Sequence, residues 1–393
     1  MKYPTLDRID CQGKTVFVRV DYNVSLTKDG AVRNETRLQA SLPTLNELRS
    51  KGAKLVLAAH LGRPEGKRDD KFSLLPVAKR LAELLECDVV APDNCIGMEV
   101  KKLVHDARPE QVVLLENLRF HAEEKANDEG FCERLAELAE IYVNDAFGTM
   151  HRSHASTVGM VKHFKQKAVG RLVEKELVFL GKLLTEPARP FVVVLGGAKV
   201  SDKIPVIENL LGKADKILIG GGMAYTFLKA KGVEVGKSLV EDSKISLAKR
   251  LMERALVKGV ELHLPVDSVI AEKCEAGSMQ RLAHNDENWG EWKALDIGPE
   301  TVRLFANVLN SSKTIFWNGP MGVYELEDFK KGTDDLAHVI GQSGAMSVVG
   351  GGDSLAAVAQ SGVMDQIAHL STGGGAALEF LAGKELPGLK VML

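Results

Sequence analysis

Short apolar runs rich in β-branched residues alternate with longer stretches of helical periodicity through both halves of the chain. This alternation is typical of βαβ units built around a parallel sheet. The predicted strands are 15–20, 55–59, 112–115 and 141–143 in the first half, and 191–195, 216–219, 260–264, 314–317 and 345–349 in the second. The pattern therefore predicts an α/β protein with two domains, each with its own parallel sheet.

A helical segment separates the two halves. Leucine and valine recur at helical spacing over 172–184, and Pro187 and Pro190 then end the pattern. We interpret this segment as the connector. The predicted division is an N-terminal domain over 1–170, an interdomain helix over 171–185 and a C-terminal domain over 186–375.

Composition narrows the class of protein. The chain has 393 residues, of which 45% are hydrophobic and 26% charged, as in ordinary globular proteins. Its 51 basic and 53 acidic residues give a net charge of -2, so neither nucleic acid nor a membrane is an expected partner. No export signal or apolar run of about 18 residues is visible. The five cysteines form no C-x-x-C pair, and we expect a cytoplasmic protein without structural zinc.

The segments that follow the strands carry the candidate chemistry. First-half strands run into Asp, Asn, His and Arg at 21–23, 60–64, 116–119 and 144–148, whereas second-half strands run into glycine-rich turns at 196–199, 220–222, 318–320 and 350–353. Ligands of open α/β sheets bind outside the carboxyl ends of the strands. We therefore expect a site for a small anion in one domain and a nucleotide site in the other, facing each other across a cleft.

Glycine-rich turns let backbone N–H groups approach phosphate, and a following helix N-terminus favours the negative charge. One glycine triplet alone could be a tight turn, but three triplets and Gly196-Gly197 make that explanation improbable. Neither standard nucleotide motif fits, because G-x-G-x-x-G is absent and the segment 232–238 is one residue short of a P-loop.

Three charged residues of the second half add to this picture. Lys199 and Lys203 lie four apart where a helix is expected to begin, which would place two like charges on one helix face at its positive end. Such an arrangement is unfavourable unless an anion lies between them. The alternative is two solvated lysines. Asp353 follows a glycine turn and would repel phosphate unless Mg²⁺ intervenes. Its alternative role is to cap a helix that starts at Ser354 or Leu355.

The first half offers donors for phosphate and carboxylate groups. Arg37, Arg63, Arg119 and Arg152, with His60, form the candidate set, although any one of them could be an ordinary surface side chain. Asp21 and Asn23 occupy alternate positions directly after a predicted strand, where they could accept from and donate to a hydroxyl group. His151 and His154 have the spacing of a zinc pair but lack a third ligand.

Eight segments make the chain resemble the phosphoglycerate kinase family, of bacterial type, along nearly its whole length: 19–24, 60–64, 116–120, 144–149, 196–200, 317–322, 350–354 and 371–375. The resemblance implies reversible phosphoryl transfer from 1,3-bisphosphoglycerate to Mg-ADP, giving 3-phosphoglycerate and ATP, in glycolysis and gluconeogenesis. It also implies a monomer with two Rossmann-like domains and a hinge. The segment 376–393 would pack back on the N-terminal domain.

The same resemblance assigns roles to individual residues. The substrate-binding residues would be Asp21, Asn23, Arg37, His60, Leu61, Gly62, Arg63, Arg119 and Arg152. The nucleotide-binding residues would be Lys203, Glu325, Gly351, Gly352, Asp353 and Ser354, with Asp353 on Mg²⁺ and Glu325 near the ribose. The groups that meet the migrating phosphoryl would be Arg37, Lys199, Gly373, Gly374 and Gly375.

Two other classes share this architecture. A two-lobed small-anion binding protein without catalysis also clamps its ligand between α/β domains, but its periplasmic form predicts an export signal. A nicotinamide-dependent dehydrogenase predicts G-x-G-x-x-G after the first strand, where this chain has Asp21-Tyr22-Asn23.

Overall fold

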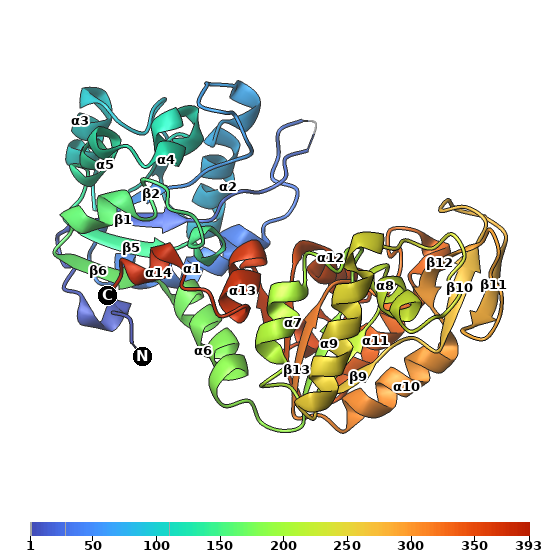
Figure 1. Ribbon diagram of the computed structural model, residues 1–393. Coiled ribbons are helices and arrows are strands. Elements are labelled where there is room, and N and C mark those ends of the chain that lie inside the picture. Colours follow the sequence, from blue (N-terminus) through green and yellow to red (C-terminus); the bar gives the residue numbers. More distant parts are fainter. Residues whose placement is uncertain (1, 28, 110) are drawn as a thin grey trace. The chain divides into compact units, whose positions relative to one another are not determined.

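The computed structural model describes residues 2–27, 29–109 and 111–393 (Figure 1), so Met1, where the first predicted domain begins, lies outside them. The chain forms two compact units. Unit 1 extends to Val178 and takes in Glu385–Leu393, and unit 2 is Phe179–Lys384. Among the described residues, no helix is long and apolar enough to cross a membrane.

Unit 1 is built on a parallel six-stranded sheet with the strand order β3-β4-β2-β1-β5-β6. Its strands are β1 (Thr15–Val20), β2 (Lys54–Ala58), β3 (Val89–Val90), β4 (Val112–Leu114), β5 (Ile141–Asp145) and β6 (Gln166–Val169). The apolar side chains of β1 and β5 are fully buried, as expected of central strands covered on both faces.

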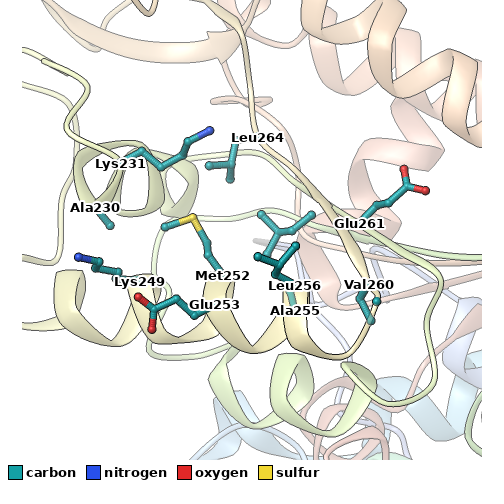
Figure 2. A pocket seen from close by; sticks show the side chains of 12 residues that line it. Ala230, Lys231, Lys249, Met252, Glu253, Ala255, Leu256, Val260, Glu261 and Leu264 are labelled. Carbon is teal, nitrogen blue, oxygen red and sulfur yellow. The ribbon is translucent and has the colours of Figure 1, made fainter.

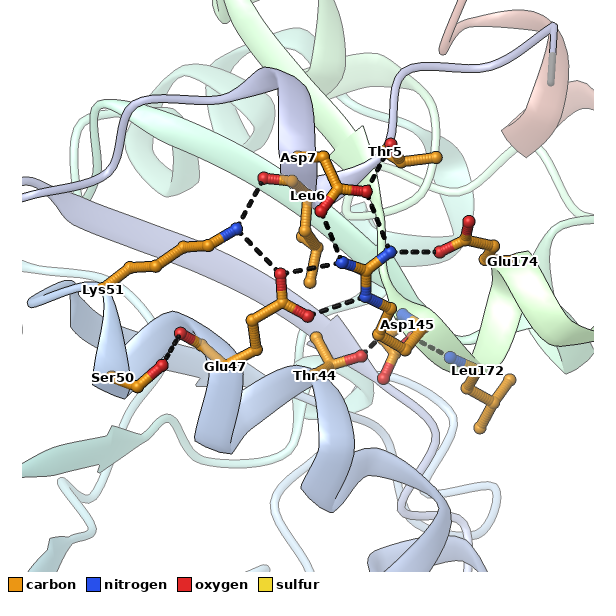
Figure 3. A network of polar contacts seen from close by, with 11 residues as sticks. Thr5, Leu6, Asp7, Thr44, Glu47, Ser50, Lys51, Asp145, Leu172 and Glu174 are labelled. Atoms are coloured by element: carbon orange, nitrogen blue, oxygen red, sulfur yellow. Dashed lines mark hydrogen bonds and ion pairs between the residues drawn. The ribbon is translucent and has the colours of Figure 1, made fainter.

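The helices of unit 1 are α1 (Thr36–Ser50), α2 (Leu75–Leu85), α3 (Met98–Asp106), α4 (Ala122–Ala126), α5 (Glu129–Ala136) and α14 (Pro387–Lys390). The helix α6 (Arg171–Thr185) begins in unit 1, which ends within it at Val178. The start of α6 is held by a polar network drawn in Figure 3. There the backbone N–H of Arg171 donates to Thr44 Oγ1 of α1 (2.7 Å) and that of Leu172 donates to Asp145 Oδ1 of β5 (3.0 Å).

Unit 2 repeats the architecture with a second parallel sheet, in the order β15-β14-β13-β7-β8-β9. Its strands are β7 (Phe191–Leu195), β8 (Lys216–Ile219), β9 (Glu261–His263), β13 (Thr314–Asn318), β14 (Met346–Gly350) and β15 (His369–Ser371). Its helices are α7 (Ile204–Leu210), α8 (Met223–Ala230), α9 (Ile245–Val257), α10 (Pro299–Asn310), α11 (Lys331–Gln342), α12 (Gly352–Gln360) and α13 (Gly374–Leu381). The two parallel sheets confirm the predicted α/β class.

A small antiparallel sheet in unit 2 lies outside the predicted pattern. It pairs β11 (Gln280–His284), β10 (Asp267–Ala271) and β12 (Lys293–Ile297) in that order. Leu295 and Ala271 from this sheet pack against Phe329, which is fully buried.

The C-terminal segment divides between the two units. In unit 2, Asn209 Nδ2 of α7 donates to the carbonyl of Leu381 in α13 (2.6 Å). In unit 1, the backbone N–H of Gly388 in α14 donates to the carbonyl of Met150 (2.8 Å). Lys167 Nζ donates to the carbonyl of Val391 (2.6 Å).

Adjacent strands lead to opposite sides of the sheet at β1 and β5 in unit 1, which are followed by β2 and β6, and at β7 and β13 in unit 2, which are followed by β8 and β14. Such switch points open a crevice at the carboxyl ends of the strands, where ligands of this fold class bind.

Candidate functional site

Asn117 organises the strand ends of unit 1. Its side-chain oxygen accepts the backbone N–H groups of Leu61 (3.3 Å) and Arg119 (3.0 Å), and its amide donates to the carbonyl of Leu61 (2.8 Å). Asn117 is 1% exposed, so these bonds form away from water. The loops after β2 and β4 are therefore tied together through one buried amide.

Gly62 lies at the centre of this arrangement. Its N–H donates to Asn23 Oδ1 (2.9 Å), and its carbonyl accepts from Arg119 Nη1 (2.8 Å). Its φ is +61°, and a Cβ here would overlap the ring of Phe72, so only glycine fits. Asn23, Gly62 and Arg119, all predicted site residues, are thus in direct contact.

His60 lies among guanidinium groups. It is 4% exposed, and Nη2 of Arg19, which is itself buried, donates to His60 Nδ1 (3.0 Å). Burial, and after it the charges of Arg19, Arg119, Arg152 and Arg37, hold the pKa of His60 well below its usual value. The imidazole is therefore neutral at pH 7, and the bond from Arg19 leaves its proton on Nε2, where it can be donated to a ligand.

The same positive field acts on two further groups. Burial, followed by the charges of Arg152 and Arg19, lowers the pKa of Arg119 to about 10, and Arg63 contributes. Burial and the charges of Arg119 and Arg152 lower the pKa of His154 to about 4. Arg37, Arg119 and Arg152 thus act on His60, and Arg63 and Arg152 act on Arg119. Such a cluster of cations favours an anionic ligand.

Two carboxylates border this cluster, and both have protein partners. Asp21 forms an ion pair with Arg37 of α1. The carboxylate of buried Glu124 accepts hydrogen bonds from the backbone N–H (2.9 Å) and the hydroxyl (2.6 Å) of Ser156.

Sequence reasoning missed Arg19 and gave His154 only a possible zinc role. The available signal was a charged residue inside an apolar strand, since Arg19 is the fifth residue of β1. His154 faces arginines, and the described residues contain no cluster of three or more His, Cys, Asp or Glu that could hold a metal.

In unit 2, Asn318 at the end of β13 joins the glycine turns. Its side chain accepts from Lys203 Nζ and donates to the carbonyl of Gly350, and its carbonyl accepts from Gly196 N–H (2.9 Å). The N–H of Gly319 donates to Ser354 Oγ in the first turn of α12 (2.6 Å). The turns after β7, β13 and β14 therefore form one hydrogen-bonded surface.

The expected placement of the two lysines on one helix face is wrong. The helix α7 begins at Ile204 with Pro205 in its first turn, and Lys203 is the N-cap. Proline suits the first turn of a helix, which fixes the start there. Lys199 lies before it in an exposed loop, and burial lowers the pKa of Lys203.

The alternative capping role of Asp353 is also wrong. The helix α12 starts at Gly352, and its N-cap is Gly351 (φ +99°), with no side-chain cap bond. Asp353 lies exposed in the first turn, and its charge, after burial, raises the pKa of Tyr324. A solvent-facing carboxylate fits Mg²⁺, which takes one or two carboxylates and completes its shell with water and phosphate oxygens.

The remaining predicted residues of unit 2 lie on exposed or terminal positions. Glu325 is exposed in the loop after β13. Gly373 is the N-cap of α13, and its N–H donates to Ser371 Oγ (3.2 Å). Gly374 has φ +51°, and Gly375 is exposed.

A pocket of about 620 Å³ lies elsewhere in unit 2, between α9 and the edge strand β9 (Figure 2). Its lining includes Met252, Leu256 and Leu262 and none of the predicted site residues.

The model of one protein family, "Phosphoglycerate kinase", matches residues 6–384. The chain belongs to the phosphoglycerate kinase family. A phosphoglycerate kinase of Anaeromyxobacter sp. (strain K) is 54% identical over 394 residues, with 99% of each chain covered. One of Thermosipho africanus is 53% identical over 393 residues, covering 99% of this chain and 97% of the relative.

Solved structures of phosphoglycerate kinases have the same fold. That from Coxiella burnetii superposes with a TM-score of 0.90 at 38% identity, covering 99% of this chain and 98% of that one. The structure from Pyrococcus horikoshii OT3 superposes with a TM-score of 0.81 at 34% identity, with the same coverage of both chains.

The family settles the class of reaction. The protein is a phosphotransferase with phosphoglycerate kinase function in glycolysis, and the family uses magnesium nucleotides. The alternatives of a non-catalytic binding protein and a dehydrogenase are therefore set aside.

Proposed function

We propose that unit 1 binds 3-phosphoglycerate and 1,3-bisphosphoglycerate at the arginine cluster. The supporting observation is that burial and the surrounding arginines lower the pKa values of His60 and Arg119, a cost that an anionic ligand would relieve. In this proposal, the guanidinium groups of Arg63, Arg119 and Arg152 hold phosphate or carboxylate oxygens.

The remaining unit 1 residues orient the substrate. Asp21 and Asn23 bind its hydroxyl group, and His60 offers a neutral N–H. Leu61 and Gly62 shape the floor through their backbone. Arg37 leaves its ion pair with Asp21 to meet the acyl phosphate.

Unit 2 binds ADP or ATP. The backbone of Gly351 and Gly352 and the hydroxyl of Ser354 lie at the start of α12, where N–H groups and the helix dipole favour phosphate. Lys203 adds a charge beside the same turn. Glu325 binds the ribose. Asp353 is the carboxylate that would hold Mg²⁺, and Mg²⁺ when bound neutralises phosphate charge.

Phosphoryl transfer needs no side-chain nucleophile, because the catalyst positions two substrates and stabilises charge on the moving group. We assign the stabilisation of that charge to the side chains of Arg37 and Lys199 and to the backbone of 373–375. The two domains, 1–170 and 186–375, would close through the interdomain helix 171–185 and exclude water from the acyl phosphate. The protein would act as a cytoplasmic monomer, without nucleic acid or membrane.

A calorimetric experiment on Asp353 tests the nucleotide half of this proposal. The variant Asp353→Asn should lose binding of Mg-ATP and keep that of 3-phosphoglycerate. Asp365→Asn, at another exposed aspartate of unit 2, is the control and should change neither. Equal loss of both ligands by Asp353→Asn would indicate a folding defect and contradict the metal role, as would unchanged Mg-ATP binding. ADP formation from ATP and 3-phosphoglycerate, followed in a coupled assay, checks turnover.

A further inference from the structure

The loop after β13, residues 319–325, carries Glu325, yet it is held from outside the parallel sheet. The hydroxyl of Thr333, in the first turn of α11, accepts the backbone N–H groups of Met321 (3.0 Å) and Gly322 (3.3 Å). Thr333 is fully buried. One side-chain oxygen thus satisfies two consecutive backbone donors of the loop.

A buried carboxylate supports this contact from the other side. Asp296 of β12 is 1% exposed; its Oδ2 accepts the N–H of Gly332 (2.7 Å), the residue before Thr333, and its Oδ1 accepts the N–H of Ile297 (2.9 Å). A Cβ on either Gly322 or Gly332 would overlap the carboxylate of Asp296. The small antiparallel sheet, the start of α11 and the loop are therefore packed at backbone distance.

One neighbouring bond completes the arrangement. The N–H of Val323 donates to the carbonyl of Leu295, next to Asp296 (2.8 Å). Beyond Val323, burial and then the charges of Asp353 and Glu325 raise the pKa of Tyr324. The loop thus leads from the Thr333 anchor to Tyr324 and Glu325.

We propose that Thr333 and Asp296 are positioning residues for the nucleotide, because they fix the loop that presents Glu325 and Tyr324. This inference rests on the proposed ribose contact of Glu325. Removing the hydroxyl leaves the buried N–H of Met321 and the half-buried N–H of Gly322 without their acceptor, and the loop must move to find water. Nucleotide affinity should fall, while the substrate on unit 1 should bind as before.

The chain contains a matched control in the same unit. The hydroxyl of Thr301, in the first turn of α10, accepts the N–H groups of Val266 (3.0 Å) and Asp267 (3.2 Å). Asp267 Oδ1 accepts the N–H of Thr301 (2.8 Å). Both side chains are buried, but this loop carries no proposed nucleotide ligand.

The test compares isosteric variants by steady-state kinetics and thermal unfolding. Thr333→Val should raise the KM for Mg-ATP about tenfold, for the loss of about one net hydrogen bond, with the KM for 3-phosphoglycerate unchanged. Thr333→Ser should restore the wild-type KM. Thr301→Val should lower the unfolding temperature similarly and leave both KM values unchanged. If Thr333→Val does not fold, Asp296→Asn is measured in its place.

Equal KM values in Thr333→Val and wild type would overturn the inference, and so would the same rise in Thr301→Val or a matching rise for 3-phosphoglycerate. Glu325→Gln separates this failure from failure of the proposed function. If Glu325→Gln raises the KM for Mg-ATP and Thr333→Val does not, only the inference fails. If Glu325→Gln has no effect, the proposed ribose contact is wrong and the inference falls with it.

Discussion

The burial of the Asp145 carboxyl group predicts an unusual dependence of protein stability on pH. It lies at the end of β5 beneath the first turn of α6 (Figure 3) and is fully buried. Its Oδ1 accepts from Leu172, whereas its Oδ2 has no hydrogen-bond partner among the described residues. Burial raises the pKa of Asp145 to about 7, and the Thr44 hydroxyl and the N–H groups of α6 offset only part of this effect.

The magnitude follows from the difference between the folded and unfolded pKa values. The pKa of Asp145 rises from 3.8 to about 7 on folding. Each pKa unit corresponds to about 1.4 kcal/mol, so the pH-dependent change in the free energy of unfolding is at most about 4 kcal/mol. The folded state holds the proton more tightly than the unfolded chain. The stabilisation is therefore complete below pH 4 and is lost as the pH rises to about 7.

The variant Asp145→Asn removes this titration. Its amide introduces buried N–H groups without acceptors, which cost about 1–3 kcal/mol at every pH. We therefore expect Asp145→Asn to be less stable than wild type near pH 4 and more stable, by about 1–3 kcal/mol, at pH 8.

Urea unfolding at several values between pH 4 and pH 9 measures this difference. The three tryptophans, Trp289, Trp292 and Trp317, all belong to unit 2, so their fluorescence follows that unit and serves as the internal control. Hydrogen exchange of peptides from β5 and the start of α6 reports unit 1. A stability difference between variant and wild type that stays constant with pH would refute the reasoning.

Three further predictions concern the reaction. Arg37→Ala and Lys199→Ala should each lower kcat about 10²- to 10³-fold with little change in KM, because both are assigned to charge that develops during transfer; steady-state kinetics showing a raised KM alone would contradict this. Arg119→Leu should abolish binding of 3-phosphoglycerate as measured by calorimetry. The stability of the ligand-free protein should change by under about 1 kcal/mol, because removing the charge that lowers the pKa of Arg119 to about 10 offsets the lost hydrogen bond to Gly62. Small-angle scattering should show a smaller radius of gyration only with both ligands bound, because each neutralises charge on one unit alone; equal radii in all states would count against closure.

The strands that sequence reasoning found are those with long apolar runs. The strands predicted over 15–20 and 191–195 are confirmed as β1 and β7. It missed six strands, namely β3, β6, β10, β11, β12 and β15. Of these, β3 has two residues, and the side chains of β11 are exposed at four of five positions. Such strands are held by pairing with a neighbour, and their own residues give little local signal.

The candidate site was predictable where it depends on the residues directly after a strand. Backbone order alone brings Asp21, His60 and Arg119 to one edge of the parallel sheet. The direction of a side chain is different, because it depends on packing. Arg19 points toward His60 because Ser156 accepts from its Nε (2.9 Å), and that contact joins residues 137 positions apart in sequence.

In the proposed function the two units would bind anions in different ways, and the difference bears on how each tolerates mutation. In unit 1, Asp21, His60 and Arg119 are buried, and the loops after β2 and β4 are fixed by Asn117, so this part of the proposed site is formed without a ligand. In unit 2, two of the charged residues proposed to meet the nucleotide, Asp353 and Glu325, are exposed, and the third, Lys203, is half-buried. Their placement depends on buried groups that touch no ligand. Substitutions in unit 1 should therefore act through the residues that bind, whereas in unit 2 they should act equally through the supports behind the loops.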